Sequence, residues 1–337
     1  MQSDLLHGGA LDHMRREFPE SKEPWIDLST GINPWPWPVQ APDLTSLNHL
    51  PSSTTFRECK AVMAKAFAAP LEAVLPAPGS EILIRLLPTL INAKTVAILD
   101  PSYGDHCRAW QLAGANVLQT ADPLAEADSA DVVVVCNPNN PDGRTFSIAD
   151  LERARKCLAK RGCWLIVDEA YVDISPELSM AENVGQGGLI VFRSVGKVYG
   201  LAGLRLGALI APEPIVNAMS ELLGVWSLPE ATLSIGADLY RDAEWLEHTK
   251  VRLSAARRRL DQILVSAGLQ VLGGTDLYRF IKTDNAHALW EHLARQAIYV
   301  RRFEALGHNL RFGLPATKAQ ESRLASALMR IDIAEPY

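Results

Sequence analysis

The chain has 337 residues, of which 48% are hydrophobic and 21% charged, with a formal net charge of −6 at pH 7. This balance is typical of a soluble globular protein with room for two domains, and it excludes the disordered and fibrous classes. The acidic charge, and the absence of a basic run longer than "ARRRL" (256–260), exclude an electrostatic footprint for nucleic acid.

The five cysteines show no CxxC or Cys/His ligand spacing, so we expect free thiols and no metal site. The first 18 residues lack a basic stretch followed by an apolar core. No apolar run approaches 18 residues without a polar interruption. We therefore expect a cytoplasmic protein that has no membrane partner.

The chain begins with about 40 residues that resist a regular interpretation, and "INPWPWP" (32–38) predicts an extended arm over residues 1–40. We expect this arm to pack with the smaller domain and the active site. Three short β-rich runs follow, "TVAILD" (95–100), "DVVVVCN" (131–137) and "CWLIVDEAY" (163–171). Each ends in a polar residue, which is typical of buried parallel strands. A helical pattern over 146–162 separates the last two runs. This alternation predicts a mainly parallel α/β sheet between helices.

Two further strands are predicted at "GGLIVFRSVGK" (187–197) and "GALIAP" (207–212). A long amphipathic helix over 244–268 comes next, followed by the short alternating strands "LQVLGG" and "LYRFIKTD". The change of pattern predicts a large domain over 41–225 and a smaller α+β domain over 226–337.

Polar segments follow four of the predicted strands: "PSYGD" (101–105), "NPNNPDG" (137–143), "DEAY" (168–171) and "SVGK" (194–197). Each alone has an ordinary explanation as a turn, a helix cap, a core aromatic or a surface lysine. Ligands of open α/β sheets bind beyond the carboxyl ends of the strands. The four segments together therefore predict one site in one crevice.

Lys197 lies in a run of small and apolar residues, and Arg205 follows eight residues later. An amine in an apolar setting gives up its proton more readily and can then attack a carbonyl. Pyridoxal phosphate chemistry needs such an amine, a carboxylate for the ring nitrogen and a site for the phosphate. Asp168 supplies the carboxylate, while Arg205, Ser194 and the "PGSE" turn (78–81) supply phosphate ligands.

The ordered set "PGSE", "PSYG", "NPNNPDG", "VDEAY" and "SVGK", with an arginine eight residues after the lysine, resembles the fold type I pyridoxal-phosphate enzymes of the aminotransferase class I/II superfamily. The resemblance spans about residues 25–315. It implies a large domain with a mainly parallel seven-stranded sheet, a smaller α+β domain, the cofactor pyridoxal 5'-phosphate and a homodimer with shared active sites.

The resemblance also implies roles for individual residues. Lys197 forms the Schiff base with the cofactor, Asp168 holds the ring nitrogen and Tyr103 stacks on the ring. The remaining cofactor ligands are Asn140 and Tyr171 at the phenolate oxygen and Gly79, Ser80, Ser194 and Arg205 around the phosphate. Glu81 is a further expected cofactor-binding residue.

Substrate residues follow from the same resemblance. "HNLRFGLP" (308–315) resembles the segment whose arginine, here Arg311, binds the α-carboxylate. Two groups within the superfamily are most similar, the histidinol-phosphate aminotransferases and the threonine-phosphate decarboxylases of cobalamin biosynthesis. Both carry a second arginine, here Arg301, with Arg302 as the less favoured choice.

The His-Gly-Gly opening of "HGGALDHM" (7–14), with the later "INP", favours the decarboxylase group. It places His7 and Asn33 at the substrate phosphate and Gly31 near the carboxylate, against the alternative of a simple turn. The expected reaction is decarboxylation of L-threonine O-3-phosphate, a small phosphorylated amino acid, to (R)-1-amino-2-propanol O-2-phosphate. The alternatives are an aminotransferase acting on histidinol phosphate or a related amino acid, and a non-catalytic binding partner.

Two positions depart from the family pattern. Leu50 stands where relatives have a tyrosine that reaches the cofactor phosphate of the partner subunit, and His49 or Ser52 are the candidates to replace it. Gly196 stands where aminotransferases often have a serine that contacts the phosphate.

Overall fold

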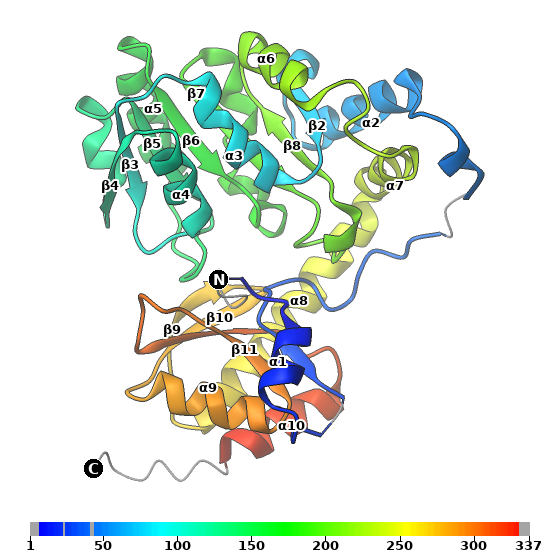
Figure 1. Ribbon diagram of the computed structural model, residues 1–337, viewed down its shortest axis with the longest axis vertical. Helices are drawn as coiled ribbons and strands as arrows, with labels where there is room; N and C mark the ends of the chain where they lie inside the picture. Colours follow the sequence, from blue (N-terminus) through cyan, green and yellow to red (C-terminus); the bar gives the residue numbers. More distant parts are fainter. Residues whose placement is uncertain (1–6, 23, 41–43, 330–337) are drawn as a thin grey trace. The chain divides into compact units, whose positions relative to one another are not determined.

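A computed structural model of the chain describes residues 7–22, 24–40 and 44–329. Contacts within the chain define two compact units (Figure 1). The larger unit contains residues 36–140 and 144–247. The smaller unit contains the described residues up to Trp35, the short segment Pro141–Gly143 and the residues from His248 onward. Each unit has its own sheet.

A seven-stranded sheet forms the centre of the larger unit, which confirms the predicted fold class. Every strand except β8 runs in the same direction, since β8 is antiparallel to both of its neighbours. In spatial order the strands are β2 (Val74–Ala77), β8 (Gly207–Ile210), β7 (Leu189–Ser194), β6 (Trp164–Asp168), β5 (Val132–Cys136), β3 (Thr95–Leu99) and β4 (Asn116–Thr120).

Helices cover both faces of this sheet. On one face α3 (Ser80–Leu90), α4 (Gly104–Leu112) and α6 (Glu213–Leu223) share an apolar core with alternate residues of the strands. On the other face α5 (Ile148–Lys160) packs on β6, and its first turn is capped by the Ser147 hydroxyl, which accepts the Asp150 amide at 3.1 Å. The remaining helices, α2 (Ser53–Ala66) and α7 (Glu230–Arg241), pack on each other.

The smaller unit contains a five-stranded sheet with helices α1 (Leu11–Glu17), α9 (Ala286–Arg295), α10 (Lys318–Met329) and most of α8 (Ala243–Ser266). Its strands, in spatial order, are β1 (Ile26–Leu28), β11 (Ile298–Arg302), β12 (Asn309–Gly313), β10 (Tyr278–Lys282) and β9 (Gln270–Thr275). The pair β1 and β11 is parallel and the other pairs are antiparallel.

The described N-terminal segment up to Trp35 counts with the smaller unit because β1 pairs with β11. The division between the units differs from the boundary expected at residue 225. Residues 226–247 belong to the larger unit because α7 packs on α2. The tip of the "NPNNPDG" loop also counts with the smaller unit, since a Cβ on Gly143 would lie only 2.1 Å from the Gly274 carbonyl oxygen.

Among residues 7–22, 24–40 and 44–329, no helix combines the length and the apolar character that a membrane span requires.

Candidate active site

The candidate site of the larger unit forms where strands β5, β6 and β7 end. Asp168 is the last residue of β6, and parallel pairing sets it beside Cys136 of β5 and Phe192 of β7. Only 5% of Asp168 is exposed. The carboxylate therefore lies at the carboxyl-terminal edge of the sheet, where open α/β sheets bind ligands. The sequence predicts this position because Asp168 ends a buried apolar run.

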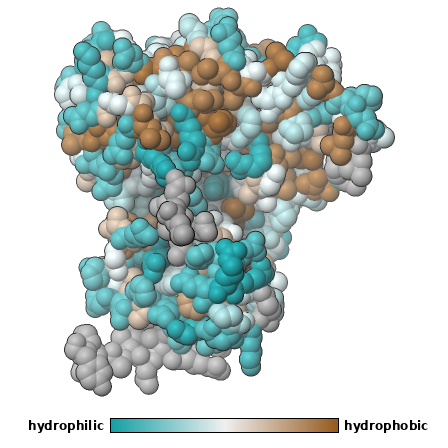
Figure 2. Space-filling model, in the orientation of Figure 1, coloured by the Kyte–Doolittle hydropathy of each residue, from teal (hydrophilic) through white to brown (hydrophobic). Residues whose placement is uncertain are grey.

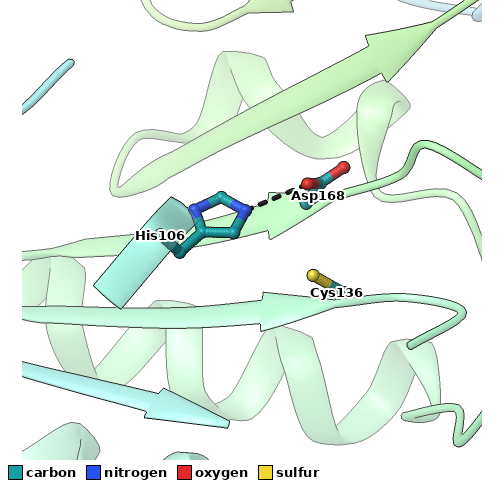
Figure 3. A group of neighbouring side chains, drawn as sticks. All are labelled: His106, Cys136 and Asp168. Atoms are coloured by element: carbon teal, nitrogen blue, oxygen red, sulfur yellow. Dashed lines mark hydrogen bonds and ion pairs between the residues drawn. The ribbon is translucent and has the colours of Figure 1, made fainter. Parts of the chain in front are cut away.

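His106 lies against Asp168 and was missed by the sequence analysis. Its Nε2 is 2.9 Å from Asp168 Oδ2, and the imidazole is 1% exposed (Figure 3). The imidazole comes from the first turn of α4, three residues after Tyr103, and the Cys136 thiol faces the same point from β5. A lone histidine three residues after a predicted ligand was the only signal for it in the sequence.

The His106 imidazole is charged near neutral pH. Burial alone would lower its pKa, but the hydrogen bond to Asp168, with a smaller effect of Cys136, raises the pKa of His106 to about 10. The ligand atoms of His106, Cys136 and Asp168 lie within 4.8 Å of one another. The hydrogen bond from His106 holds the Asp168 carboxylate in place at the end of β6.

Glycines and the expected phosphate ligands form a close-packed cradle at the start of α3. Gly79, with φ of +83°, leads into the helix, and a Cβ there would lie 2.9 Å from Nη2 of Arg205. A Cβ on Gly207 would lie 2.7 Å from the Ser80 amide nitrogen, and Gly207 is the register partner of Ser194. The predicted phosphate ligands therefore meet at a helix N-terminus, which favours an anion.

Glu81 also lies at this cradle. Its Oε2 is 3.9 Å from Nη2 of Arg205, and its Oε1 accepts a hydrogen bond from Arg85 at 3.1 Å. These contacts make Glu81 a neighbour of the phosphate-binding arginine. Its predicted role as a direct cofactor ligand stays a prediction.

Lys197 is half-buried, and its Nζ lies 5.8 Å from the centre of the Tyr171 ring. The two residues come from the ends of β7 and β6, respectively. A Cβ on Gly196 would lie 3.1 Å from the Cα of Ala202, so the close approach of these two segments accounts for glycine where relatives carry serine.

The loop after β3 is tied to the loop after β5 by Asn139. Its side chain accepts a hydrogen bond from the Ser102 hydroxyl at 2.8 Å and donates one to the Pro101 carbonyl at 2.9 Å. Tyr103 lies next to this link, and burial, with the nearby Asp105 carboxylate, raises the pKa of Tyr103 above its ordinary value. Asn139 thus supports the segment that carries Tyr103, while Asn140 remains the predicted ligand of the cofactor oxygen.

A buried ionic cluster lies directly behind the site. Arg193 donates to Glu169 at 3.1 Å and also to Asp173, and all three side chains are at most 5% exposed. Glu169 and Arg193 are the neighbours in sequence of Asp168 and Ser194, whose side chains leave the strands on the opposite face. The cluster therefore joins the ends of β6 and β7 from behind.

The smaller unit brings the two predicted substrate arginines together. Arg301 of β11 and Arg311 of β12 are register partners, so their side chains share one face of the sheet. The Phe303 ring contacts both guanidinium groups, at 5.2 Å and 6.0 Å. Arg302 leaves on the opposite face, where it lies over the Trp290 ring of α9 at 4.5 Å. The geometry favours Arg301 over Arg302 as the second arginine.

The His-Gly-Gly segment packs against Ser29, directly after β1. The Gly9 amide donates to the Ser29 hydroxyl at 2.8 Å, and a Cβ on Gly8 would lie 2.6 Å from the Ser29 carbonyl oxygen. The same carbonyl accepts Nη2 of Arg311 at 2.7 Å. The close approach of this segment to Ser29 requires both glycines. Exposed His7 therefore directly precedes a segment that contacts the same residue as Arg311.

The other two predicted substrate residues of the N-terminal segment, Gly31 and Asn33, are buried. Gly31 is buried and adopts a φ of +60°, and Asn33 is 2% exposed with its Oδ1 accepting the Trp35 amide at 2.9 Å. Leu50 is 63% exposed. Of its suggested replacements, Ser52 caps α2 by accepting the Thr54 amide at 3.1 Å.

The chain is similar in sequence to one protein family and to individual proteins of known activity. The model of the family described as aminotransferase class I and II matches residues 40–328. The chain is 38% identical over 327 residues to a threonine-phosphate decarboxylase of Pseudomonas aeruginosa, covering 96% of this chain and 97% of that protein. It is 36% identical over 337 residues to a threonine-phosphate decarboxylase of a Sinorhizobium species, covering 99% of this chain and 100% of that protein.

A solved structure shares the fold. Histidinol-phosphate aminotransferase from Sinorhizobium meliloti, in complex with pyridoxal-5'-phosphate, matches with a TM-score of 0.81 at 17% identity, covering 94% of this chain and 93% of that one. The sequence and fold comparisons agree over nearly the whole chain. The chain belongs to the aminotransferase class I and II family.

Proposed function

We propose that the protein is a pyridoxal-phosphate-dependent lyase that decarboxylates L-threonine O-3-phosphate to (R)-1-amino-2-propanol O-2-phosphate, a step of cobalamin biosynthesis. The observation that carries this proposal is the similarity of 36–38% over nearly the full length to two threonine-phosphate decarboxylases. The His-Gly-Gly segment and the paired arginines of the smaller unit are the features of this chain that suit a substrate with a carboxylate and a phosphate.

The residues of the larger unit fit the cofactor. Asp168, held in place by the hydrogen bond with His106, would hold the ring nitrogen. The cradle of Gly79, Ser80, Ser194 and Arg205 leaves no room for a side chain on its glycine and would hold the phosphate. Lys197 would supply the amine for the aldehyde. When bound, pyridoxal phosphate supplies an electron-withdrawing ring that accepts the electron pair of a bond broken at the substrate Cα.

The substrate residues decide which Cα bond breaks. Arg311 would bind the α-carboxylate, and Arg301 with His7 and Asn33 would bind the phosphate, so that the two anionic ends fix the orientation of Cα. Binding that exposes the bond to the carboxylate would favour loss of carbon dioxide, with the electron pair of that bond accepted by the cofactor and a proton then added to Cα. Binding that exposes the bond to the Cα hydrogen would favour transamination instead. Orientation by the arginines is therefore the basis of reaction choice.

A product assay tests the proposed function. Holoenzyme incubated with L-threonine O-3-phosphate should release carbon dioxide without any added 2-oxoacid. Release of no carbon dioxide, together with amino transfer from histidinol phosphate to a 2-oxoacid, would establish the alternative aminotransferase. A purified protein with no near-violet absorption band that borohydride removes would contradict both enzymatic functions and favour the binding-partner alternative.

We further propose that the protein is a homodimer, as its family resemblance implies. Brown apolar surface gathers on the larger unit over α3 and near α2 and α7 (Figure 2). In the described chain, side chains such as Leu47, Leu50, Val225 and Trp226 are 60–82% exposed. Apolar surface of this kind is typical of a protein interface. Light scattering of the holoenzyme should give twice the chain mass of 36.9 kDa.

A further inference from the structure

One aromatic side chain lies against both arginines of the smaller unit. Phe303 directly follows β11, two residues after Arg301. The guanidinium carbon of Arg301 lies 5.2 Å from the centre of the Phe303 ring, and that of Arg311 lies 6.0 Å from the same centre. Both distances are within the range of a cation–π interaction. A single ring is therefore shared by two cations.

The pairing of these two arginines has an electrostatic cost. Arg301 and Arg311 are register partners on antiparallel strands, so two permanent positive charges lie directly opposite each other. Like charges in this arrangement destabilise a sheet. The face of an aromatic ring is negative and attracts cations. The Phe303 ring therefore offsets part of the repulsion and keeps the two guanidinium groups together.

The Phe303 ring is itself held in place. Phe280 of β10 is the register partner of Arg311, and its ring lies 6.1 Å from that of Phe303, centre to centre, at an angle of 75°. Phe280 is 5% exposed, and Phe303 is half-buried. The Phe303 carbonyl accepts the Leu306 amide at 3.2 Å, which closes the turn after β11. The shared ring is thus supported by a buried aromatic neighbour and by a hydrogen-bonded turn.

Arg311 has a second contact that fixes its position. Its Nη2 donates to the Ser29 carbonyl at 2.7 Å, and the Ser29 hydroxyl donates to Asp27 Oδ1 at 2.6 Å. We call these three residues the polar cluster around Ser29. Arg311 is therefore anchored independently of Phe303, and the shared ring relates the position of Arg301 to that anchored group.

We propose that Phe303 is a positioning residue that holds Arg301 and Arg311 as one binding site for a substrate with two anionic ends. The inference rests on the proposed function, because it takes Arg311 as the ligand of the α-carboxylate and Arg301 as that of the phosphate. Two guanidinium groups that are held before the substrate arrives lose less rotamer entropy on binding. A compound with both anions therefore benefits from the ring at both ends, and one with a single anion benefits at one end.

The test compares Phe303→Leu with the matched control Phe18→Leu. The centre of the Phe18 ring lies 5.7 Å from the guanidinium carbon of Arg295, so this control also removes a ring from an arginine of the smaller unit. Phe18 packs on Trp290, on the opposite face of the small sheet. Phe303→Leu should raise the KM for L-threonine O-3-phosphate about tenfold with kcat nearly unchanged, because each lost cation–π interaction weakens one anionic end about threefold. Phe18→Leu should leave both constants unchanged.

Single anions measure the two ends of the site separately. Inorganic phosphate and acetate should each raise the unfolding temperature of the holoenzyme, in which the cofactor occupies the cradle at α3. Phe303→Leu should need about threefold more of either anion for the same shift, and Phe18→Leu should need no more than wild type. Weakening of one anion alone would show that the ring serves a single arginine, and it would overturn the inference. The absence of any shift in the wild-type holoenzyme would overturn it as well.

Two aromatic replacements separate the charge of the ring from its shape, and they keep the test decisive if Phe303→Leu fails to fold. Pentafluorophenylalanine at position 303 keeps a flat ring, but its fluorine atoms withdraw the electrons that make the face negative. This variant should have the raised KM of Phe303→Leu, whereas Phe303→Tyr retains the negative face and should have the wild-type KM. A wild-type KM with the fluorinated ring would show that Phe303 acts by packing alone, and the inference would be wrong.

The outcomes distinguish the inference from the proposed function. If the wild-type enzyme releases no carbon dioxide but Phe303→Leu still weakens the effects of both inorganic phosphate and acetate, the proposed reaction is wrong and the positioning role stands. If the wild-type enzyme is active and Phe303→Leu has the same KM as Phe18→Leu, the function stands and the positioning role is wrong.

Discussion

Arg301 and Arg302 are adjacent in β11, yet their guanidinium groups lie on opposite faces of the small sheet. Arg301 shares its face with Arg311 and contacts Phe303, whereas Arg302 lies over Trp290 of α9. Two neighbouring arginines therefore have different environments, and only one of them is on the face that carries the polar cluster around Ser29.

Substitution of these two arginines gives the first prediction. Arg301→Ala should raise the KM for L-threonine O-3-phosphate by about tenfold to a hundredfold, because a charge-assisted hydrogen bond to the phosphate is lost. Arg302→Ala should leave the KM within about twofold of wild type, since its lost contact is a cation–π interaction with Trp290. Steady-state kinetics on both variants checks this. Equal KM values for the two variants would count against the assignment of Arg301.

Lys197→Ala should abolish turnover and leave the fold intact. Lys197 is half-buried and lies three residues beyond the end of β7, outside the sheet that forms the core. The variant should still bind pyridoxal phosphate without a covalent link, because Asp168 and the cradle at α3 are unchanged. Absorption spectroscopy before and after dialysis measures the retained cofactor. Normal activity of Lys197→Ala would refute its role.

Arg205→Ala should weaken cofactor retention about tenfold or more, because the guanidinium next to Gly79 is lost from the phosphate cradle. Arg153→Ala is the control, since Arg153 is an exposed arginine on α5. The dissociation constant of pyridoxal phosphate from each apoprotein, measured by fluorescence, gives the comparison. Equal retention by the two variants would remove Arg205 from the site.

The His106–Asp168 pair predicts a pH dependence of stability. The folded-state pKa of His106, about 10, lies above its ordinary value of 6.5. The pair therefore contributes its full stability below about pH 6.5 and loses it as the pH rises through about 10. His106→Asn lacks this contribution and should be less stable by about 3 kcal/mol near pH 6. The difference from wild type should shrink as the pH approaches 10.

Chemical unfolding of both apoproteins across this pH range measures the difference. Titrating groups that do not contact residue 106 contribute equally to both proteins, so the difference reports on the His106–Asp168 pair. A difference that grows with pH would show that the imidazole is neutral in the folded protein.

The His-Gly-Gly segment should not tolerate a methyl group. A Cβ on Gly8 would meet the Ser29 backbone at 2.6 Å, so Gly8→Ala must move the segment or Ser29 and should raise the substrate KM severalfold. Gly307→Ala is the control in the same unit, because nothing lies within 4 Å of its Cβ and its φ is ordinary. Substrate kinetics of the two variants would show whether the segment is a simple turn.

Much of the larger unit could be predicted from the sequence because each strand is a short apolar run with polar residues at its end. Asp168 and Ser194 lie at such ends, and the parallel register brings them to one edge. His106 could not be found in this way, because it is not at a strand end and its partner is remote in sequence. The pairing of His106 with Asp168 results from tertiary packing and leaves no local pattern in the sequence.

The smaller unit was harder to predict. The alternation in β11 indicated that Arg301 and Arg302 lie on opposite faces of the strand. Which of these faces is covered depends on where α9 packs. The contact of Arg311 with the Ser29 carbonyl was not predictable, since it joins segments that are remote in sequence. The boundary near residue 225 could not be located because α7 has the same helical pattern whether it packs on α2 or elsewhere. The individual roles of the site residues stay predictions for the variants above.

The pairing of β1 with β11 affects how a newly made chain reaches its final form. Ile26 has Ile298 as its register partner, so β1 cannot pair with β11 until the ribosome has synthesised residue 298. Residues 36–247 can complete most of their sheet during that time, because its strand pairs lie much closer in sequence. Pairing of β1 with β11 can therefore follow only after the strands of the larger unit have been synthesised, and the contacts of Arg311 with Ser29 depend on the same late step.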